Sequence, residues 1–199
     1  MIPKTRRTVS FVSYSESMAS RRTRARVHEA VLSLVSLEGF AKITMEGVAS
    51  RAGVGKQTLY RSWPSTGAVL FDALLAQSQS PDGSVVVPDS GDLRTDLIRL
   101  VQETIAELCH PTMEPLLRSV TAAIQTDVIL ATQYRELLLE PQMQAVAGRL
   151  QRGGVERPEE VAELLLGPLL HRWLLRHGAL DDSWAEAHVE RVLRASGTN

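Results

Sequence analysis

The segment from Lys56 to Arg61 combines side chains that can bind both the phosphates and the base edges of DNA. Lysine and arginine bind phosphates and guanine acceptors, glutamine can pair with adenine through two hydrogen bonds, and threonine and tyrosine offer hydroxyls. A helix of about two turns over these residues would bury Leu59 alone. The outward positions would then be Lys56, Gln57, Thr58, Tyr60 and Arg61. The pattern predicts a short helix suited to the major groove.

A second short helix is predicted directly before this segment. Thr44 is a good N-cap, and apolar residues follow at helical spacing up to Ala52. Gly53 can adopt the left-handed conformation that a sharp turn between two helices needs, and Val54 can fill the angle between them. Gly55 then opens the next helix. Together the two segments indicate a helix-turn-helix.

The order of these residues resembles the DNA-binding signature of the tetracycline repressor-like (TetR) family of transcriptional regulators. The matching residues are Thr44, Ala52–Gly53–Val54 and Thr58–Leu59–Tyr60. The apolar run from Val27 to Phe40 resembles the family's first helix, and residues 65–79 resemble its fourth. The resemblance implies a homodimer that binds a palindromic operator, most often as a repressor, and that a small molecule releases.

Three residues depart from the usual pattern of this family. Gly55 stands where a serine often caps the second helix, and Trp63 replaces the commoner phenylalanine. Thr66 occupies a position that is frequently lysine. Thr66 can still hydrogen-bond a phosphate, but it contributes no charge and therefore no counterion release.

Charge is distributed unevenly along the chain and supports a nucleic-acid partner for its first third. The whole chain has 22 basic and 23 acidic residues. Residues 1–66 contain 11 Lys or Arg and 4 Asp or Glu, so residues 67–199 hold the remaining 11 and 19. Residues 1–20 are rich in Ser and Thr and are predicted to form a disordered arm. Arg22 and Arg24, which follow, are expected to contact the DNA backbone or minor groove.

The sequence argues against two kinds of enzyme site. Residues 53–58, GVGKQT, look like a phosphate-binding loop, but Ser50 stands where that loop needs glycine and Gln57 follows the lysine. The five histidines show no metal-ligand spacing, and the neighbours Cys109 and His110 would point in different directions on a helix. We therefore expect no enzyme activity, no metal and no cofactor.

Beyond residue 78 the sequence is helical throughout and predicts a second domain. The expected helices are 92–108, 113–126, 133–152 with a break near Glu140 caused by Pro141, 159–177 and 183–195. The fold class is all-α, with a helix-turn-helix DNA-binding domain at 21–66 and a helical regulatory and dimerisation domain at 67–199. One cysteine, no signal-like start and no apolar run of about eighteen residues indicate a cytoplasmic protein without membrane contact.

The leucine-rich helix 159–177 carries apolar residues around most of its circumference, more than one neighbour would bury. We expect it to pack on its own core and also on a second subunit, together with the last helix; a central helix of a monomer is the alternative. The predicted dimer interface is Leu166, Leu170, Trp173, Leu174, Trp184, Val189 and Val192.

The sequence does not identify a small-molecule effector. Polar or soft residues on apolar helices are the candidates to line a cavity. They are Gln102, Cys109, His110, Gln125, His171 and Trp173. A dimeric sensor that binds a small molecule but not DNA is the alternative function, mainly because of Gly55 and Thr66.

Overall fold

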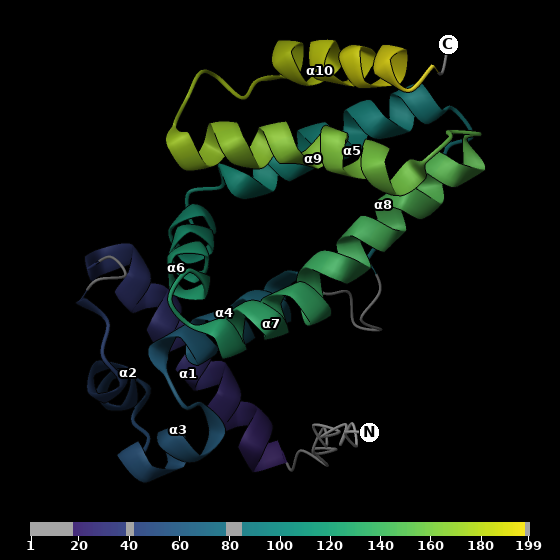
Figure 1. Ribbon diagram of the computed structural model, residues 1–199. Coiled ribbons are helices and arrows are strands. Elements are labelled where there is room, and N and C mark those ends of the chain that lie inside the picture. The colour runs from purple at the N-terminus through teal and green to yellow at the C-terminus, as the bar shows by residue number, and fades with distance from the viewer. Residues whose placement is uncertain (1–17, 39–41, 79–84, 198–199) are drawn as a thin grey trace, which may run out of the picture.

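The computed structural model describes residues 18–38, 42–78 and 85–197, and within these ranges every regular element is a helix. The predicted all-α class is therefore confirmed. Figure 1 shows two parts, with α1 to α3 at the lower end and α9 and α10 at the upper end. Among the described residues, no helix combines the length and the hydropathy that crossing a membrane requires.

The N-terminal helices are α1 (Met18–Glu38), α2 (Met45–Ala52), α3 (Lys56–Ser62) and α4 (Thr66–Ser78). Helix α4 packs against α1 on one side and against α6 (Glu114–Ile124) on the other. Buried side chains from the first four helices and from α6, such as Val31, Leu59, Leu70 and Leu116, form one continuous core. The helix-turn-helix thus shares its core with α6, which belongs to the second part of the chain.

A second core lies at the upper end of the molecule, between α5 (Leu93–Leu108), α8 (Glu140–Arg152), α9 (Pro158–Leu175) and α10 (Asp182–Ala195). Helix α7 (Val128–Tyr134) and the π-helical turn η2 (Arg135–Leu139) contribute Leu130 and Leu138 to the first core. Side chains of α5, α8, α9 and α10, including Leu97, Leu150, Leu165 and Val189, are fully buried in the second core. Helix α10 contacts both α5 and α9.

The α-helix is interrupted near Glu140 as predicted, but by a π-helical turn directly before α8 begins at Glu140, and the first part begins earlier than predicted, at Val128. Pro141 cannot donate a backbone hydrogen bond, and in a regular helix its ring would clash with the carbonyl one turn earlier. The preceding π-turn removes the conflict by widening the helix, and the N–H of Glu140 reaches back to the carbonyl of Arg135. Helices α7 and α8 therefore form one long rod, which runs diagonally across the molecule in Figure 1.

Two further predicted boundaries are wrong. Helix α1 begins at Met18, so residues 18–20 are helical and not part of an arm, whereas residues 1–17 of that arm lie outside the described residues. Helix α9 ends at Leu175 instead of His177, because Arg176 adopts the left-handed conformation (φ 52°) and caps it. The predicted terminator, Gly178, lies in the loop that follows.

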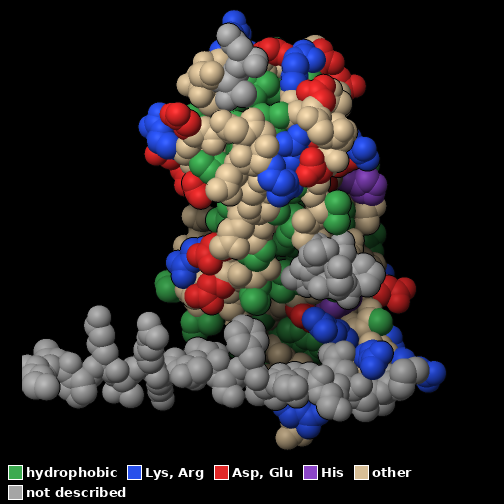
Figure 2. Space-filling model, turned by 90° about the vertical axis from the view of Figure 1, so that its right-hand side faces the viewer, with side chains coloured by type: hydrophobic (Ala, Val, Ile, Leu, Met, Phe, Trp, Pro, Cys, Tyr) green, Lys and Arg blue, Asp and Glu red, His purple; other side chains and the backbone are tan. Residues whose placement is uncertain are grey.

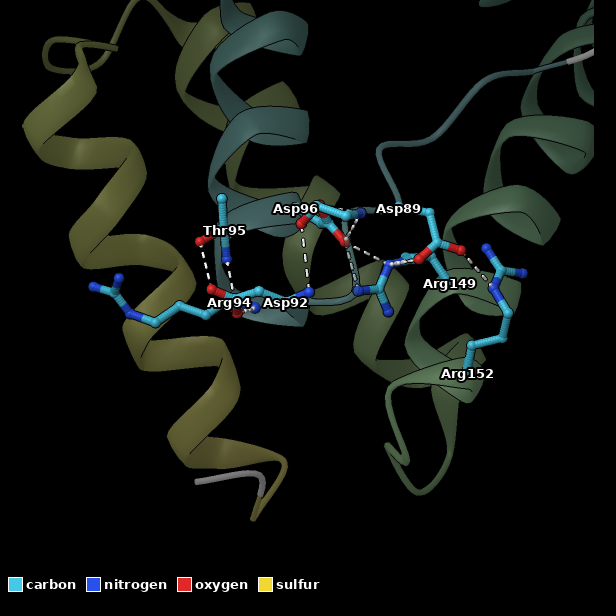
Figure 3. A network of polar contacts seen from close by, with 8 residues as sticks. Asp89, Asp92, Arg94, Thr95, Asp96, Arg149 and Arg152 are labelled. Atoms are coloured by element: carbon cyan, nitrogen blue, oxygen red, sulfur yellow. Dashed lines mark hydrogen bonds and ion pairs between the residues drawn. The ribbon is translucent and has the colours of Figure 1, made fainter.

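A buried ion pair joins α5 to α8 (Figure 3). Arg149 donates from Nε to Oδ2 of Asp96 at 2.9 Å, and only 2–3% of each side chain is exposed. Burial alone would raise the pKa of Asp96, but hydrogen bonds from Ser90 and Arg149 outweigh this effect and lower the pKa. Arg149 also lies 3.4 Å from Asp89, which binds Arg152 in turn. The network holds the start of α5 against the end of α8.

Candidate nucleic-acid interface and internal cavity

The turn between α2 and α3 has the geometry that the sequence predicts. The hydroxyl of Thr44 accepts a hydrogen bond of 3.0 Å from the N–H of Gly47, which confirms its role as the N-cap. Gly53 is left-handed (φ 61°), and its N–H caps the last carbonyls of α2. A Cβ at Gly53 would lie 2.8 Å from the guanidinium of Arg26. A side chain is therefore disfavoured at this position both by the left-handed backbone and by lack of space.

Helix α3 buries one side chain and exposes the rest. Leu59 is fully buried, whereas the predicted contact residues are all exposed. They are Gly55, Lys56, Gln57, Thr58, Tyr60 and Arg61. Gly55 itself needs no special conformation, and an added Cβ would meet only the hydroxyl of Thr58, at 3.8 Å. Figure 2 shows Lys and Arg side chains close together at the lower end of the molecule, where α1 to α3 lie.

Glu46 on α2 lies beside this face, and its part there was not foreseen. Its carboxylate is 3.6 Å from Nζ of Lys56 and accepts a 3.4 Å hydrogen bond from the hydroxyl of Tyr60. Backbone hydrogen bonding and the charge of Lys56 lower the pKa of Glu46, while partial desolvation and the Glu46 charge raise the pKa of Tyr60. Glu46 therefore contacts two side chains, Lys56 and Tyr60, that the sequence predicts to bind DNA.

The arginines at the start of α1 have different environments. Arg22 is exposed, as a phosphate ligand must be. Arg24 binds the carboxylate of Asp72 on α4, which gives it a structural role that the sequence did not predict. Arg26 donates to the carbonyls of Ala52 and Gly53, 2.6 Å from the latter, and so fixes the turn of the helix-turn-helix.

Asp72 is the centre of a polar cluster that the sequence did not reveal. Its Oδ2 atom lies 2.9 Å from Nε of Arg24, 2.8 Å from Nε2 of His28 and 3.0 Å from Nε1 of Trp63. Burial alone would raise the pKa of Asp72, but the hydrogen bonds from His28 and Arg24 prevail and lower the pKa to about 2. The cluster joins α1, the end of α3 and α4. Thr66, half-buried, begins α4 three residues after Trp63.

A cavity of about 310 Å³ lies between α5, α6, the α7–α8 rod and α9. Most of its wall is leucine from these helices, with Met143 and Gly167. Its polar lining residues are Ser78, Thr104, Glu107, Tyr134, Gln142 and Glu163. Tyr134 also packs on Phe71 of α4, with ring centroids 5.9 Å apart, so the cavity wall touches the helix that carries Asp72.

None of the six residues predicted to line a cavity is among the described residues of this wall. Cys109, His110 and Gln125 lie at helix ends and are exposed, and Gln102 is half-buried on α5 away from the wall. Trp173 is buried under Arg118, whose guanidinium lies 4.3 Å from its ring centroid. His171 lines a different, open groove. A cavity depends on how helices meet, which residue polarity alone does not show.

That open groove lies between α9 and α10 and has a volume of about 430 Å³. The residues of the predicted dimer interface differ in their exposure. Trp173, Val189 and Val192 are 0–5% exposed and pack mainly within their own subunit, and Leu166 lines the internal cavity. Leu170, Leu174 and Trp184 remain accessible. The sequence reasoning missed Leu164 and Leu175, which are 53% and 65% exposed on α9.

Comparison with known proteins identifies relatives that share both parts of this chain. A family model described as bacterial regulatory proteins, tetR family, matches residues 29–73, and one described as tetracyclin repressor-like, C-terminal domain, matches residues 87–192. The uncharacterized HTH-type transcriptional regulator YdeS of Bacillus subtilis is 29% identical over 192 residues, which cover 89% of this chain and 94% of YdeS. The DNA-binding transcriptional repressor TetR of Mycobacteroides abscessus is 28% identical, over 81% of this chain and 87% of its own.

A solved structure agrees with these relatives. The crystal structure of the TetR family transcription regulator SCO0332 superimposes with a TM-score of 0.67 at 33% identity. The match covers 87% of this chain and 97% of SCO0332. The similarity therefore extends over both the helix-turn-helix and the helices that enclose the cavity.

Proposed function

Because this chain belongs to the TetR family of transcriptional regulators, we propose that it is a repressor that binds a palindromic operator as a homodimer and leaves it when a small molecule binds. Members of this family are DNA-binding regulators that act as dimers, and not enzymes. The observation that carries the proposal is the exposed polar face of α3, presented by a glycine turn that Arg26 fixes. The named repressor among its relatives supports the sign of the regulation.

In the proposed complex α3 enters the major groove. Gln57 and Thr58 lie at its N-terminal end, where helix-turn-helix proteins contact base edges. Lys56, Tyr60 and Arg61 would bind phosphates or guanine, with Arg22, Thr44 and Thr66 at the flanking phosphates. Lys56 and Tyr60 must give up their contacts with Glu46 before they can bind DNA. The loss of these contacts reduces the net binding free energy that each new DNA contact contributes.

The exposed apolar residues of α9 support dimerisation through α9 and α10. Leu164, Leu174 and Leu175 present apolar surface to solvent beside the groove lined by Trp184. Pairing this face with a second copy about a twofold axis would bury it. The pair would place two copies of α3 on one side, for successive major grooves.

The contacts between the cavity and α4 support a route for effector release. Tyr134 lines the cavity and packs on Phe71, which is followed by Asp72. An effector that binds one placement of Tyr134 more tightly than another would shift α4, and Asp72 would carry the shift to Trp63 at the end of α3. Only a difference in affinity between the two placements can do this.

A footprint on the DNA next to the gene tests the proposal. The apo protein should protect a palindrome at low salt, and the protection should weaken as salt rises. Lys56→Ala and Tyr60→Phe should each weaken binding by about 1–3 kcal/mol, and only Lys56→Ala should reduce the salt slope by about one unit. The matched control is Arg99→Ala, which removes one exposed positive charge from α5.

Two results would decide against the proposal. Absence of any protected site at low salt would favour the alternative, a dimeric small-molecule sensor that does not bind DNA. Equal losses in Lys56→Ala and Arg99→Ala would mean that net charge, and not the face of α3, governs binding.

A further inference from the structure

We propose that the internal cavity binds a lipophilic organic cation and that the carboxylates of Glu107 and Glu163 supply its counter-charge. The inference names the chemical class of the effector and rests on the proposed function only for the release of DNA. Binding itself can be measured on the free protein. The evidence is the combination of an apolar wall with unpaired acidic side chains.

The wall of the cavity selects for apolar ligands. Leucines from α5, α6, η2 and α9 and the thioether of Met143 make up most of it. At about 310 Å³ the cavity lies at the lower end of the range for small-molecule sites, which begins at about 300 Å³. Burial of a ligand's hydrocarbon surface against this wall is the main source of affinity.

The charged groups in the wall are all of one sign. Glu107 comes from α5 and Glu163 from α9, and no Lys, Arg or His is among the described residues that line the cavity. Neither carboxylate has a hydrogen-bond or ion-pair partner among residues 18–38, 42–78 and 85–197. On the same two helices Asp96 is paired with Arg149, Glu103 with Arg99 and Glu160 with Arg157.

The surroundings of Glu107 act on its carboxyl group. Its side chain remains accessible from outside, yet desolvation by the surrounding helices raises the pKa of its carboxyl. Burial and the charge of Glu107 also raise the pKa of Tyr134. A cation placed between them would offset the charge and could rest on the negative face of the Tyr134 ring.

The same features discriminate against other ligands. An anion would meet two carboxylates without a basic residue among the described lining residues to balance them. A neutral apolar molecule could enter, but it would form no ion pair with the carboxylates. Of two ligands with the same shape, the cavity should therefore bind the cation more tightly than the anion.

Tetraphenylphosphonium and its isosteric anion tetraphenylborate test this by calorimetric titration of the full-length, DNA-free protein. Tetraphenylphosphonium should bind, and tetraphenylborate should bind at least about tenfold more weakly. Glu107→Gln and Glu163→Gln keep the side-chain shape and should each weaken binding of the cation by about tenfold. The control Glu103→Gln, one turn earlier on α5 and outside the cavity, should bind like the wild type.

Several results would overturn the inference. They are equal binding of the two ions, no binding of the cation, or the same loss in Glu103→Gln as in Glu107→Gln. Release of operator DNA is measured separately by gel shift. If the cation binds as expected but DNA stays bound, the proposed release of DNA by an effector is wrong and the proposed ligand class stands. If the cation does not bind while operator binding is intact, only the proposed ligand class is wrong.

Discussion

The indole N–H of Trp63 donates a 3.0 Å hydrogen bond to Oδ2 of Asp72, and this bond ties the end of α3 to α4. Phenylalanine, the residue expected at this position from the resemblance, has no N–H and could not form it. The Trp63 side chain is only 8% exposed, so it fills a buried aromatic position at the end of α3. Its hydrogen bond also links α3 to α4, the helix whose Phe71 packs on Tyr134 of the cavity wall.

Trp63→Phe should therefore lower the free energy of unfolding by about 1 kcal/mol, because one hydrogen bond is lost while Asp72 keeps Arg24 and His28. Chemical denaturation measures the change. In an Asp72→Ala background the acceptor of this hydrogen bond is already gone, and the same substitution should cost clearly less. An equal cost in both backgrounds would show that ring size, and not the hydrogen bond, matters.

The lowered pKa of Asp72 predicts a specific loss of stability in acid. A carboxyl of ordinary pKa 3.8 in the unfolded chain and about 2 in the folded chain stabilises the fold above pH 3.8. This contribution disappears as the pH falls from about 4 to about 2. It amounts to at most about 2 kcal/mol, because a fifth of the side chain is still exposed.

Denaturation of the wild type and Asp72→Asn between pH 7 and pH 2 measures this contribution. The stability difference should be constant from neutral pH to about pH 4 and should shrink below it. The other carboxyls titrate in both proteins and cancel. A difference that stays constant down to pH 2 would contradict the assignment.

Removal of the Glu46 charge should tighten DNA binding. Glu46 is about half exposed, interacts with Lys56 and Tyr60, and would place a negative charge near the phosphates. Glu46→Gln should raise operator affinity by about two- to tenfold at low salt, and the gain should fall as salt rises. Fluorescence anisotropy across a salt series is the measurement. Glu156→Gln, at an exposed site in the α8–α9 loop, should change nothing; weaker binding by Glu46→Gln would assign Glu46 a positioning role instead.

A charge on the exposed face of α9 should separate the subunits. Leu164→Glu places a carboxylate where apolar surface would meet a second copy, and analytical ultracentrifugation should show a shift from dimer to monomer. Operator affinity should fall with it, because two half-sites are no longer bound together. Val128→Glu alters an equally apolar residue, 81% exposed on α7, and should remain dimeric. A dimeric Leu164→Glu would move the interface away from this groove.

The sequence predicted those features that depend on neighbouring residues. The cap at Thr44, the left-handed turn at Gly53 and the single buried Leu59 follow from side chains within one or two turns of each other. The Asp72 cluster was not predictable in this way, because Arg24 and His28 are 48 and 44 residues from Asp72 in the chain. Their meeting depends on how α1 and α4 pack.

The regulatory part was predicted less well for a related reason. The leucine content predicts two partners for α9, but the choice between cavity, core and subunit interface depends on small rotations of the helix. Leu166, Leu169 and Leu170 line the cavity, whereas Leu165 is fully buried and does not line it. Sequence polarity assigns these neighbours the same role. Only the packing of α5, α8 and α10 around them distinguishes their positions.

The π-turn at Arg135–Leu139 gives the α7–α8 rod one more residue than a regular helix of the same length would hold. Deletion of a single residue there would restore regular winding and turn everything beyond it by about 100° about the helix axis. Val146, Ala147 and Leu150, now buried at the upper core, would then face a different direction while Leu130 kept its place at the lower core. The inserted residue thus sets the angular register between the two cores, and the sequence beyond it is matched to that register.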